Sequence, residues 1–292
     1  MRRFGRTLAT AALAVAVVAG TAGWAAGDGV QAAVTGPPPG ASAWRADSAS
    51  GRPLPDPATA SAYEVARFLA GLDEAGRRGP VRRHPLVVGN LDGAPVALRY
   101  EANRLAVAAS GRARFASLAA PGRQVLAFDP RGRGQVAEVF EDLERAAHVA
   151  VVVPGSDDDA TSYGAGRAPH TGPAGMARSL HAAAGGETAV VAWTGYSTPV
   201  GVGLDAATGR LAEAGAVRLA RFTAGLDAVG APDPVPFGHS YGSVVCGLAA
   251  RHTDAFGAGT VPASDVQGHT GYFVPGTRSL AAFAAFAKGE AQ

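Results

Sequence analysis

The strongest candidates for catalytic residues in this chain of 292 residues lie in the motif Gly238-His239-Ser240-Tyr241-Gly242. A serine between two glycines at this spacing is typical of a sharp turn from a strand into a helix, because small flanking residues let both elements pass closely. Such a turn lifts the serine hydroxyl clear of the strand, and the next N–H group can stabilise an oxyanion. Val-Pro-Phe precedes the motif and a helical pattern follows it. We therefore predict that Ser240 is a nucleophile and that Tyr241 contributes its N–H.

A serine hydroxyl needs a base, usually a histidine that a carboxylate orients. Two of the seven histidines follow the serine along the chain, as the base does in the fold that carries such turns. His252 ends the helix after the serine, where a capping cation is the simplest interpretation. His269 lies in a loop before the last predicted helix, so we predict that it is the base. His239 is expected to point away from the serine hydroxyl and to be structural.

The carboxylate partner is the weak point of this constellation. Only 28 residues separate Ser240 from His269, and they contain two carboxylates, Asp254 and Asp265. Either residue could orient His269, and each is equally compatible with a surface turn. The sequence leaves this choice open.

The second oxyanion donor is expected from the loop Val-Pro-Gly-Ser-Asp-Asp-Asp, where Gly155 and Ser156 offer backbone N–H groups. Three adjacent carboxylates, Asp157 to Asp159, follow them. Such neighbours cannot all reach one ion, so we predict a solvated turn or a helix cap rather than a metal site. No Gly-x-Gly-x-x-Gly opens a helix after the first core strand and there is no phosphate-binding loop, so we predict neither a cofactor nor a metal.

The elements that must position these residues alternate along the second half of the chain. Continuous apolar runs at 124–128, 148–153 and 188–193 are typical of buried strands, and alanine-rich segments at about 136–147, 173–184 and 206–228 favour helices. This alternation predicts an α/β protein with a parallel sheet covered by helices on both faces. Ligands bind at the carboxyl ends of such strands, where the predicted turns and Ser240 lie.

Four segments follow from composition. Residues 1–33 begin with basic Met-Arg-Arg-Phe-Gly-Arg and continue as an apolar run, which predicts a signal peptide or an uncleaved membrane anchor, and hence a secreted or extracytoplasmic protein. Residues 34–60, rich in Pro, Gly and Ser, are expected to form a flexible linker. Residues 61–120 are predicted to be a helical N-terminal segment, and residues 121–292 the α/β core.

Composition also limits the partners. The formal net charge is +2 and no basic stripe carries interleaved aromatic residues, so we predict no nucleic-acid partner. A membrane contact is expected only through an uncleaved N-terminus.

Cys246 is the single cysteine and lies in an apolar helical stretch, so it is interpreted as a small buried hydrophobe. A single cysteine cannot form an internal disulfide.

An ordered set of motifs resembles a known family. They read VLAFDPRG, DLERAAHVAVVVPGS, AVVAWTGYSTP, GHSYGS and HTGYFVPGTRSLAAFA, with GNLDGAPVALRYEANR upstream of them. From about Pro85 to Gly289 the chain is similar to the actinobacterial α/β-hydrolases catalogued as a domain of unknown function, DUF1023. The resemblance implies an α/β-hydrolase fold and a serine hydrolase with Ser240 as nucleophile and His269 as base. It implies no particular substrate.

The chain departs from this family after the turn at Ser240. The family pattern has two more strands between nucleophile and base, one of which typically carries the catalytic acid at its end. The simplest hypothesis is an internal deletion that joins the helix after Ser240 to the later segment beginning Asp254-Ala255-Phe256. The strand entering the turn would then lie at a sheet edge or beside the C-terminal strand, and an edge tolerates Pro236.

The leading hypothesis is an exported serine hydrolase, similar to carboxylesterases and lipases, that cleaves an ester or related acyl bond of a small-molecule substrate. Loss of the acid-bearing segment would weaken it. The alternative is a catalytically inactive binding protein of the same fold, or the product of an interrupted gene.

Overall fold

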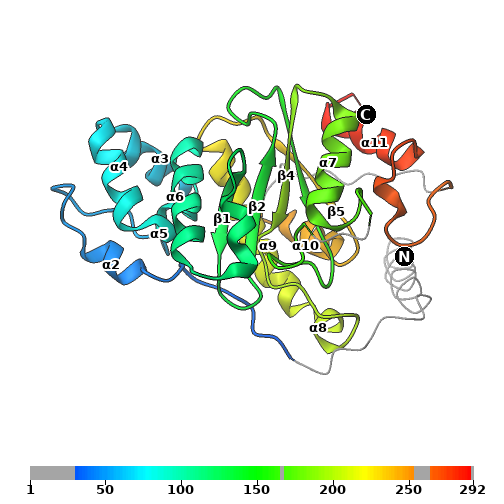
Figure 1. Cartoon of the computed structure of the whole chain (residues 1–292), viewed down its shortest axis with the longest axis horizontal. Coiled ribbons are helices and arrows are strands. Elements are labelled where there is room, and N and C mark those ends of the chain that lie inside the picture. The colour runs from blue at the N-terminus through cyan, green and yellow to red at the C-terminus, as the bar shows by residue number, and fades with distance from the viewer. Residues whose placement is uncertain (1–29, 165–167, 253–263, 291–292) are drawn as a thin grey trace, which may run out of the picture.

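The computed structural model describes residues 30–164, 168–252 and 264–290. Their strands form one five-stranded sheet in the order β1-β2-β4-β3-β5 (Figure 1). The strands are β1 (Gln124–Asp129), β2 (Gln135–Phe140), β3 (His148–Val153), β4 (Thr188–Thr194) and β5 (Pro234–Gly238). β3 pairs in parallel with both β4 and β5, so the carboxyl ends of these three strands lie at one edge of the sheet.

Strand β2 corrects one prediction from the sequence, a helix at about 136–147, within an α/β fold whose sheet was predicted to be mainly parallel. Gln135–Phe140 is a strand antiparallel to both β1 and β4, so the sheet is mixed. The turn before it contains Gly132 and Gly134, whose φ angles of 57° and 90° favour glycine. A β-carbon at Gly134 would come 2.8 Å from the Phe115 ring. This glycine turn reverses the chain direction, so that β1 and β2 form a hairpin.

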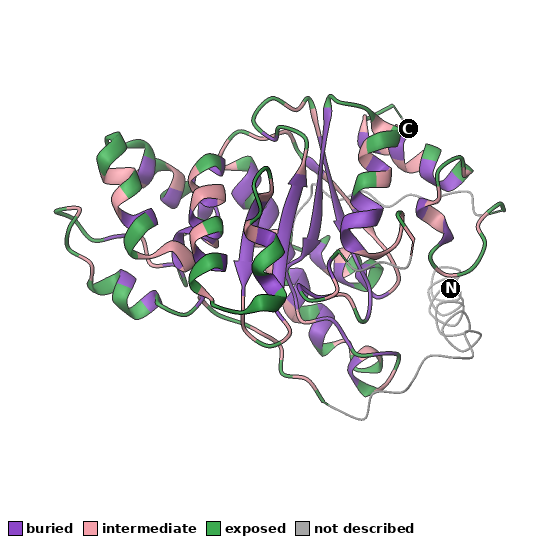
Figure 2. Cartoon of the chain, viewed as in Figure 1, coloured by how far each residue is buried: buried purple, intermediate pink, exposed green. Residues whose placement is uncertain are grey.

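Helices cover both faces of the sheet, as predicted. On one face α9 (Arg210–Asp227) and α10 (Gly242–Ala249) pack against β3 and β4 around the buried Trp193 and Phe222. On the other face α7 (Gly172–Ala184) and α11 (Arg278–Ala287) pack against the alternate residues of the same strands. The strands are therefore buried on both sides (Figure 2). A short helix, α8 (Leu204–Ala207), precedes α9, and Gly209 separates them at φ 69°.

The helical N-terminal segment is part of the same body. It comprises α3 (Ala62–Ala70), α4 (Glu74–Arg83), α5 (Pro85–Gly89), α6 (Val96–Ala109) and a 3-10 helix (Ala113–Ala119). The fully buried Asn103 side chain donates 3.0 Å hydrogen bonds to the backbone oxygens of Gly89 and Val125, which links α6 to α5 and to β1. The buried Asp92 pairs with Arg99 of α6 and Arg218 of α9. These contacts fix the segment against the core.

The region predicted as a flexible linker contains an anchored helix that was not expected. Residues 41–46 form helix α2 (Ala41–Ala46), whose Trp44 is fully buried. The Trp44 Nε1 donates a 2.7 Å hydrogen bond to the backbone oxygen of Pro55, and Leu54 is buried beside it. One tryptophan thus anchors a segment whose average composition is typical of a linker.

Residues 1–29 of the predicted signal segment lie outside the described residues. The first described residues form an extended segment without helix or strand. In it, Gln31 N donates a hydrogen bond to Asp205 Oδ2 at 2.9 Å, and Val34 N donates one to Ser197 Oγ at 3.0 Å. Within the described ranges, no helix combines the length and apolarity needed to cross a bilayer.

Strand β5 is the last strand in the sheet order, so it lies at an edge of the described sheet. Its Pro236 is opposite Val151 of β3. The His239 N–H donates to the Val153 oxygen at 2.9 Å, and N–H groups alternate sides along a strand, so the Val235 and Phe237 positions face β3. Pro236 therefore faces away from β3, and its missing N–H removes no hydrogen bond from that pairing.

Candidate active site

Ser240 occupies a strained turn between β5 and α10. Its φ angle is 55°, in the left-handed region that non-glycine residues rarely adopt. A β-carbon at Gly238 would come 2.6 Å from Ser243 Cα, and one at Gly242 would collide with the backbone oxygen of Val153. Both glycines are therefore required for the helix to turn back over the strands.

The loop after β3 lies directly against this turn. A β-carbon at Gly155 would come 2.6 Å from Ser240 Cβ and 2.9 Å from Ser240 Oγ. The loop is buried at Gly155 and Ser156, and the Tyr196 hydroxyl donates a 2.7 Å hydrogen bond to the Pro154 oxygen just before it. The backbone of Gly155 and Ser156 is thus held beside the serine hydroxyl, where the sequence analysis expected oxyanion donors.

The Tyr241 side chain anchors the other expected donor. Its hydroxyl accepts a 3.1 Å hydrogen bond from the N–H of Ala212, and its ring stacks on Tyr196 with 6.4 Å between centroids. Tyr241 is the residue that caps α10, so its backbone lies at the start of that helix. The same tyrosine pair therefore supports both the turn and the loop after β3.

A cavity of about 150 Å³ opens over Ser240. It is lined by Gly155, Ser156, Asp158, Thr171, Gly172, Met176, His239, Ser240, His269 and Thr270. The fold thus brings Ser240, His269 and both expected residues of the loop after β3 to one small cavity at the carboxyl ends of β3 and β5.

His239 and His269 contact each other at this cavity. Their ring centroids are 4.9 Å apart, and His239 Nε2 donates a 2.8 Å hydrogen bond to the backbone oxygen of His269. Burial lowers the pKa of both imidazoles below the ordinary value for histidine. Both rings are therefore neutral at pH 7, the state in which a histidine can accept a proton. His239 was expected to point away from the serine hydroxyl, but it lines the same cavity as Ser240, and its hydrogen bond to the His269 loop was not foreseen.

This geometry agrees with a comparison against known families. A family model described as Alpha/beta hydrolase matches residues 129–280, more than half of the chain. The chain belongs to the alpha/beta hydrolase family. The match begins at the end of β1 and reaches into α11, so it includes the Ser240 turn, the loop after β3 and His269. Comparisons with curated proteins and with solved structures found no match.

Two carboxylates lie between Ser240 and His269 in the sequence of this hydrolase, and the structure describes one of them. Asp254 lies outside the described residues. Asp265 is exposed, and its Oδ2 accepts a 2.7 Å hydrogen bond from the N–H of Arg278 at the start of α11. This contact is typical of a helix N-terminus. Asp265 does not line the Ser240 cavity.

The three adjacent aspartates of the hydrolase have three different surroundings. Asp157 has a φ of 66°, and its Oδ1 accepts a 3.0 Å hydrogen bond from Gly201 N. Asp159 is buried and pairs with Arg133 at 2.5 Å.

Asp158 lines the Ser240 cavity. Burial raises the pKa of the Asp158 carboxyl to about 7, and the neighbouring carboxylates act in the same direction. All three aspartates were predicted to form a solvated turn or a helix cap, and the position of Asp158 at the cavity differs from that prediction.

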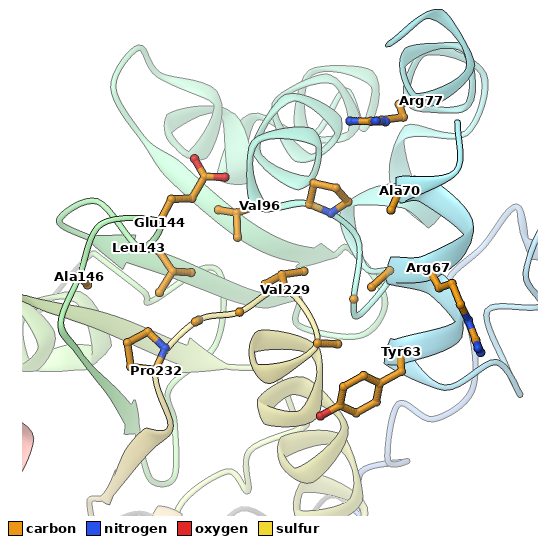
Figure 3. Close-up of a pocket in the computed structure, with 16 residues that line it drawn as sticks. Tyr63, Arg67, Ala70, Arg77, Val96, Leu143, Glu144, Ala146, Val229 and Pro232 are labelled. Atoms are coloured by element: carbon orange, nitrogen blue, oxygen red, sulfur yellow. The ribbon is translucent and has the colours of Figure 1, made fainter. Parts of the chain in front are cut away.

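A cavity larger than the one over Ser240 lies elsewhere in the hydrolase. It has a volume of about 880 Å³ and is bordered by α3 and by the segments that precede β3 and β5 (Figure 3). Leu143, Glu144 and Ala146 form one side, and Val229 and Pro232 lie near them. It is therefore at the amino ends of the parallel strands, opposite to Ser240. None of the described residues that line it is a serine, cysteine or histidine, the residue types of Ser240 and His269 among them.

Proposed function

We propose that the chain is a serine hydrolase, similar to carboxylesterases and lipases, that cleaves an ester or related acyl bond through Ser240 and His269. The observation that carries the proposal is the shared cavity: a serine in a left-handed turn, a neutral histidine and the loop after β3 all border one space of about 150 Å³. These parts are what acyl transfer requires in this fold.

The proposed reaction has two halves. Ser240 Oγ attacks the acyl carbonyl while His269 accepts the hydroxyl proton, and the oxyanion is held by N–H groups of Tyr241 and of Gly155 or Ser156. His269 then gives its proton to the leaving alcohol, which departs as the acyl-serine ester forms. A water molecule attacks that ester with His269 again as base, so the acid is released and Ser240 recovers its proton.

We expect a reduced rate compared with a relative that has the full interval between serine and base. No strand follows β5 within the described residues, and Asp265 accepts a hydrogen bond from the first residue of α11 and does not border the cavity. The sequence between Ser240 and His269 lacks the two further strands of the family pattern, and in serine hydrolases removal of the orienting carboxylate leaves only part of the rate enhancement.

Hydrolysis of short p-nitrophenyl esters tests the proposal. The protein should release p-nitrophenolate above the uncatalysed rate, and Ser240→Ala should remove this activity without lowering the melting temperature. Equal rates for the two proteins would show that Ser240 does not act as the nucleophile.

The edge position of β5 favours a second candidate, an inactive binding protein or the product of an interrupted gene. Exposed strand edges promote aggregation and local opening. A soluble monomer that melts cooperatively but hydrolyses no ester would favour the binding protein. Insoluble or partly folded material would favour the interrupted gene.

We also propose that the chain is exported, on the basis of the basic start and apolar run within residues 1–33. Ala25, Ala26 and Ala33 are small residues that could precede a cleavage site. Ala26 fits the fold better than Ala33, because cleavage after Ala33 would remove the contact of Gln31 with Asp205. N-terminal sequencing of secreted protein should give a start at Gly27. A start at Val34 would contradict this assignment.

A further inference from the structure

The Ser240 cavity has an unusual charge balance. Asp158 is the one acidic residue among the described residues that line it, and none of these is a lysine or arginine. The two histidines at the cavity do not offset that charge, because burial keeps both neutral at pH 7. An ionised Asp158 would therefore make the cavity negative.

The backbone holds Asp158 close to the reacting groups. Asp157 N donates to Pro199 O at 2.8 Å, and the Thr198 hydroxyl donates to the backbone oxygen of Asp158 at 2.7 Å. These bonds fix the loop only three residues after Gly155, which touches Ser240. A group that meets the Asp158 carboxyl would thus lie near the carbonyl that Ser240 attacks.

The groups packed around Asp158 leave its charge largely uncompensated. Asp157 and Asp159 flank it, and the Tyr196 hydroxyl beneath the loop is bound to Pro154. Arg133 is the one base that favours the ionised form, and its guanidinium pairs with Asp159. Burial accordingly raises the pKa of Asp158 to about 7. A cation that enters the cavity would supply the missing counter-charge.

We propose that Asp158 makes the cavity selective for esters whose short acyl group carries an ammonium group a few bonds from the scissile carbonyl. The size of the cavity agrees with a short group: about 150 Å³ is the space of roughly five water molecules. This inference rests on the proposed hydrolase function, although the recognition step itself does not require turnover.

Three methyl esters of similar length test the selection at pH 8, where Asp158 is mostly ionised. They are methyl 3-aminopropanoate, neutral methyl butanoate and anionic monomethyl succinate, and proton release gives kcat/KM for each. The cationic ester should exceed the neutral one by about tenfold, as a charged hydrogen bond would provide, and the anionic ester should be the poorest. Asp158→Asn should remove this ranking. Asp233→Asn, which deletes an exposed carboxylate before β5, should keep it.

A binding measurement separates recognition from catalysis. In Ser240→Ala, which cannot form the acyl enzyme, calorimetry or NMR titration should show about tenfold tighter binding of methyl 3-aminopropanoate than of methyl butanoate. The double variant with Asp158→Asn should lose that difference while still melting cooperatively. Selective binding without hydrolysis in the unmodified chain would refute the proposed function and retain the inference. Equal binding of the two esters, or a preference that survives Asp158→Asn, would overturn the inference.

Discussion

His239 Nε2 donates a hydrogen bond to the backbone oxygen of His269, so the residue beside the nucleophile holds the loop that carries the expected base. The contact joins two segments 30 residues apart in the chain. A carbonyl oxygen only accepts, so His239 carries a proton on Nε2. His239 is therefore a positioning residue whose effect on Ser240 passes through His269.

Replacing His239 tests this link. His239→Phe should lower kcat by about tenfold with little change in KM, because the ring volume is kept and the hydrogen bond to the His269 loop is lost. His239→Gln, which can donate from a similar position, should recover most of the rate. An unchanged kcat in His239→Phe, or the same loss of kcat in both variants, would argue against positioning through this bond.

The contact between Gly155 and Ser240 predicts a steric effect. In Gly155→Ala the new methyl group would come 2.9 Å from Ser240 Oγ, which forces either the loop or the turn to move. We expect loss of esterase activity and destabilisation by about 1–3 kcal/mol, as for an overpacked core. Gly247→Ala in α10 is the matched control, because its β-carbon meets no atom within 4 Å. The measurements are urea unfolding and ester hydrolysis.

Asp158 predicts a dependence of stability on pH. Its pKa is about 7 in the folded protein and near 3.8 for an exposed aspartate, so the folded state holds an extra proton between these values. Stability from this group is therefore highest below pH 4, falls as the pH rises toward 7, and is constant above that range. Asp158→Asn should remove this decline.

The measurement is the difference in melting temperature between Asp158→Asn and the unmodified protein at pH 5 and pH 8. The variant should gain more at pH 8, with a shift of about 2–4 °C for each kcal/mol of relieved penalty. A larger gain at pH 5 would show that the Asp158 carboxyl is not held in its protonated form.

Asn103 predicts that the helical segment and the sheet unfold together. Asn103→Ala would leave the buried oxygens of Gly89 and Val125 without this donor, which should cost about 2–4 kcal/mol in the free energy of unfolding. Arg104→Ala, at the next and exposed position of α6, should change it by less than about 0.5 kcal/mol. Two separate unfolding transitions would contradict a single cooperative body.

Short-range sequence patterns predicted the buried central strands, one helix and the turn at Ser240. The apolar runs of β3 and β4 and the helix α7 lie where the sequence indicated, and the glycine spacing around Ser240 gives the turn that was expected. β2 was missed because Glu138 interrupts its apolar pattern. That carboxylate is buried in the sheet and paired with Arg123, fifteen residues away, which no local pattern reveals.

Tertiary contacts also decide the two other differences. Trp44 and Leu54 anchor parts of residues 34–60 to the fold, although the Pro and Gly content of this region is typical of a linker. Asp157, Asp158 and Asp159 are identical in the sequence, and only the positions of Gly201, Arg133 and the Ser240 cavity distinguish them. A charge that faces a cavity is a property of the folded chain.

The most direct test of the account is the rate at which a fluorophosphonate probe labels the purified protein, with the modified peptide identified by mass spectrometry. If Ser240 is the nucleophile and His269 its base, the probe labels Ser240, does not label Ser240→Ala, and labels His269→Ala at least about 100-fold more slowly. Labelling at another residue, or an unchanged rate in His269→Ala, would contradict the assignment of Ser240 and His269 as nucleophile and base.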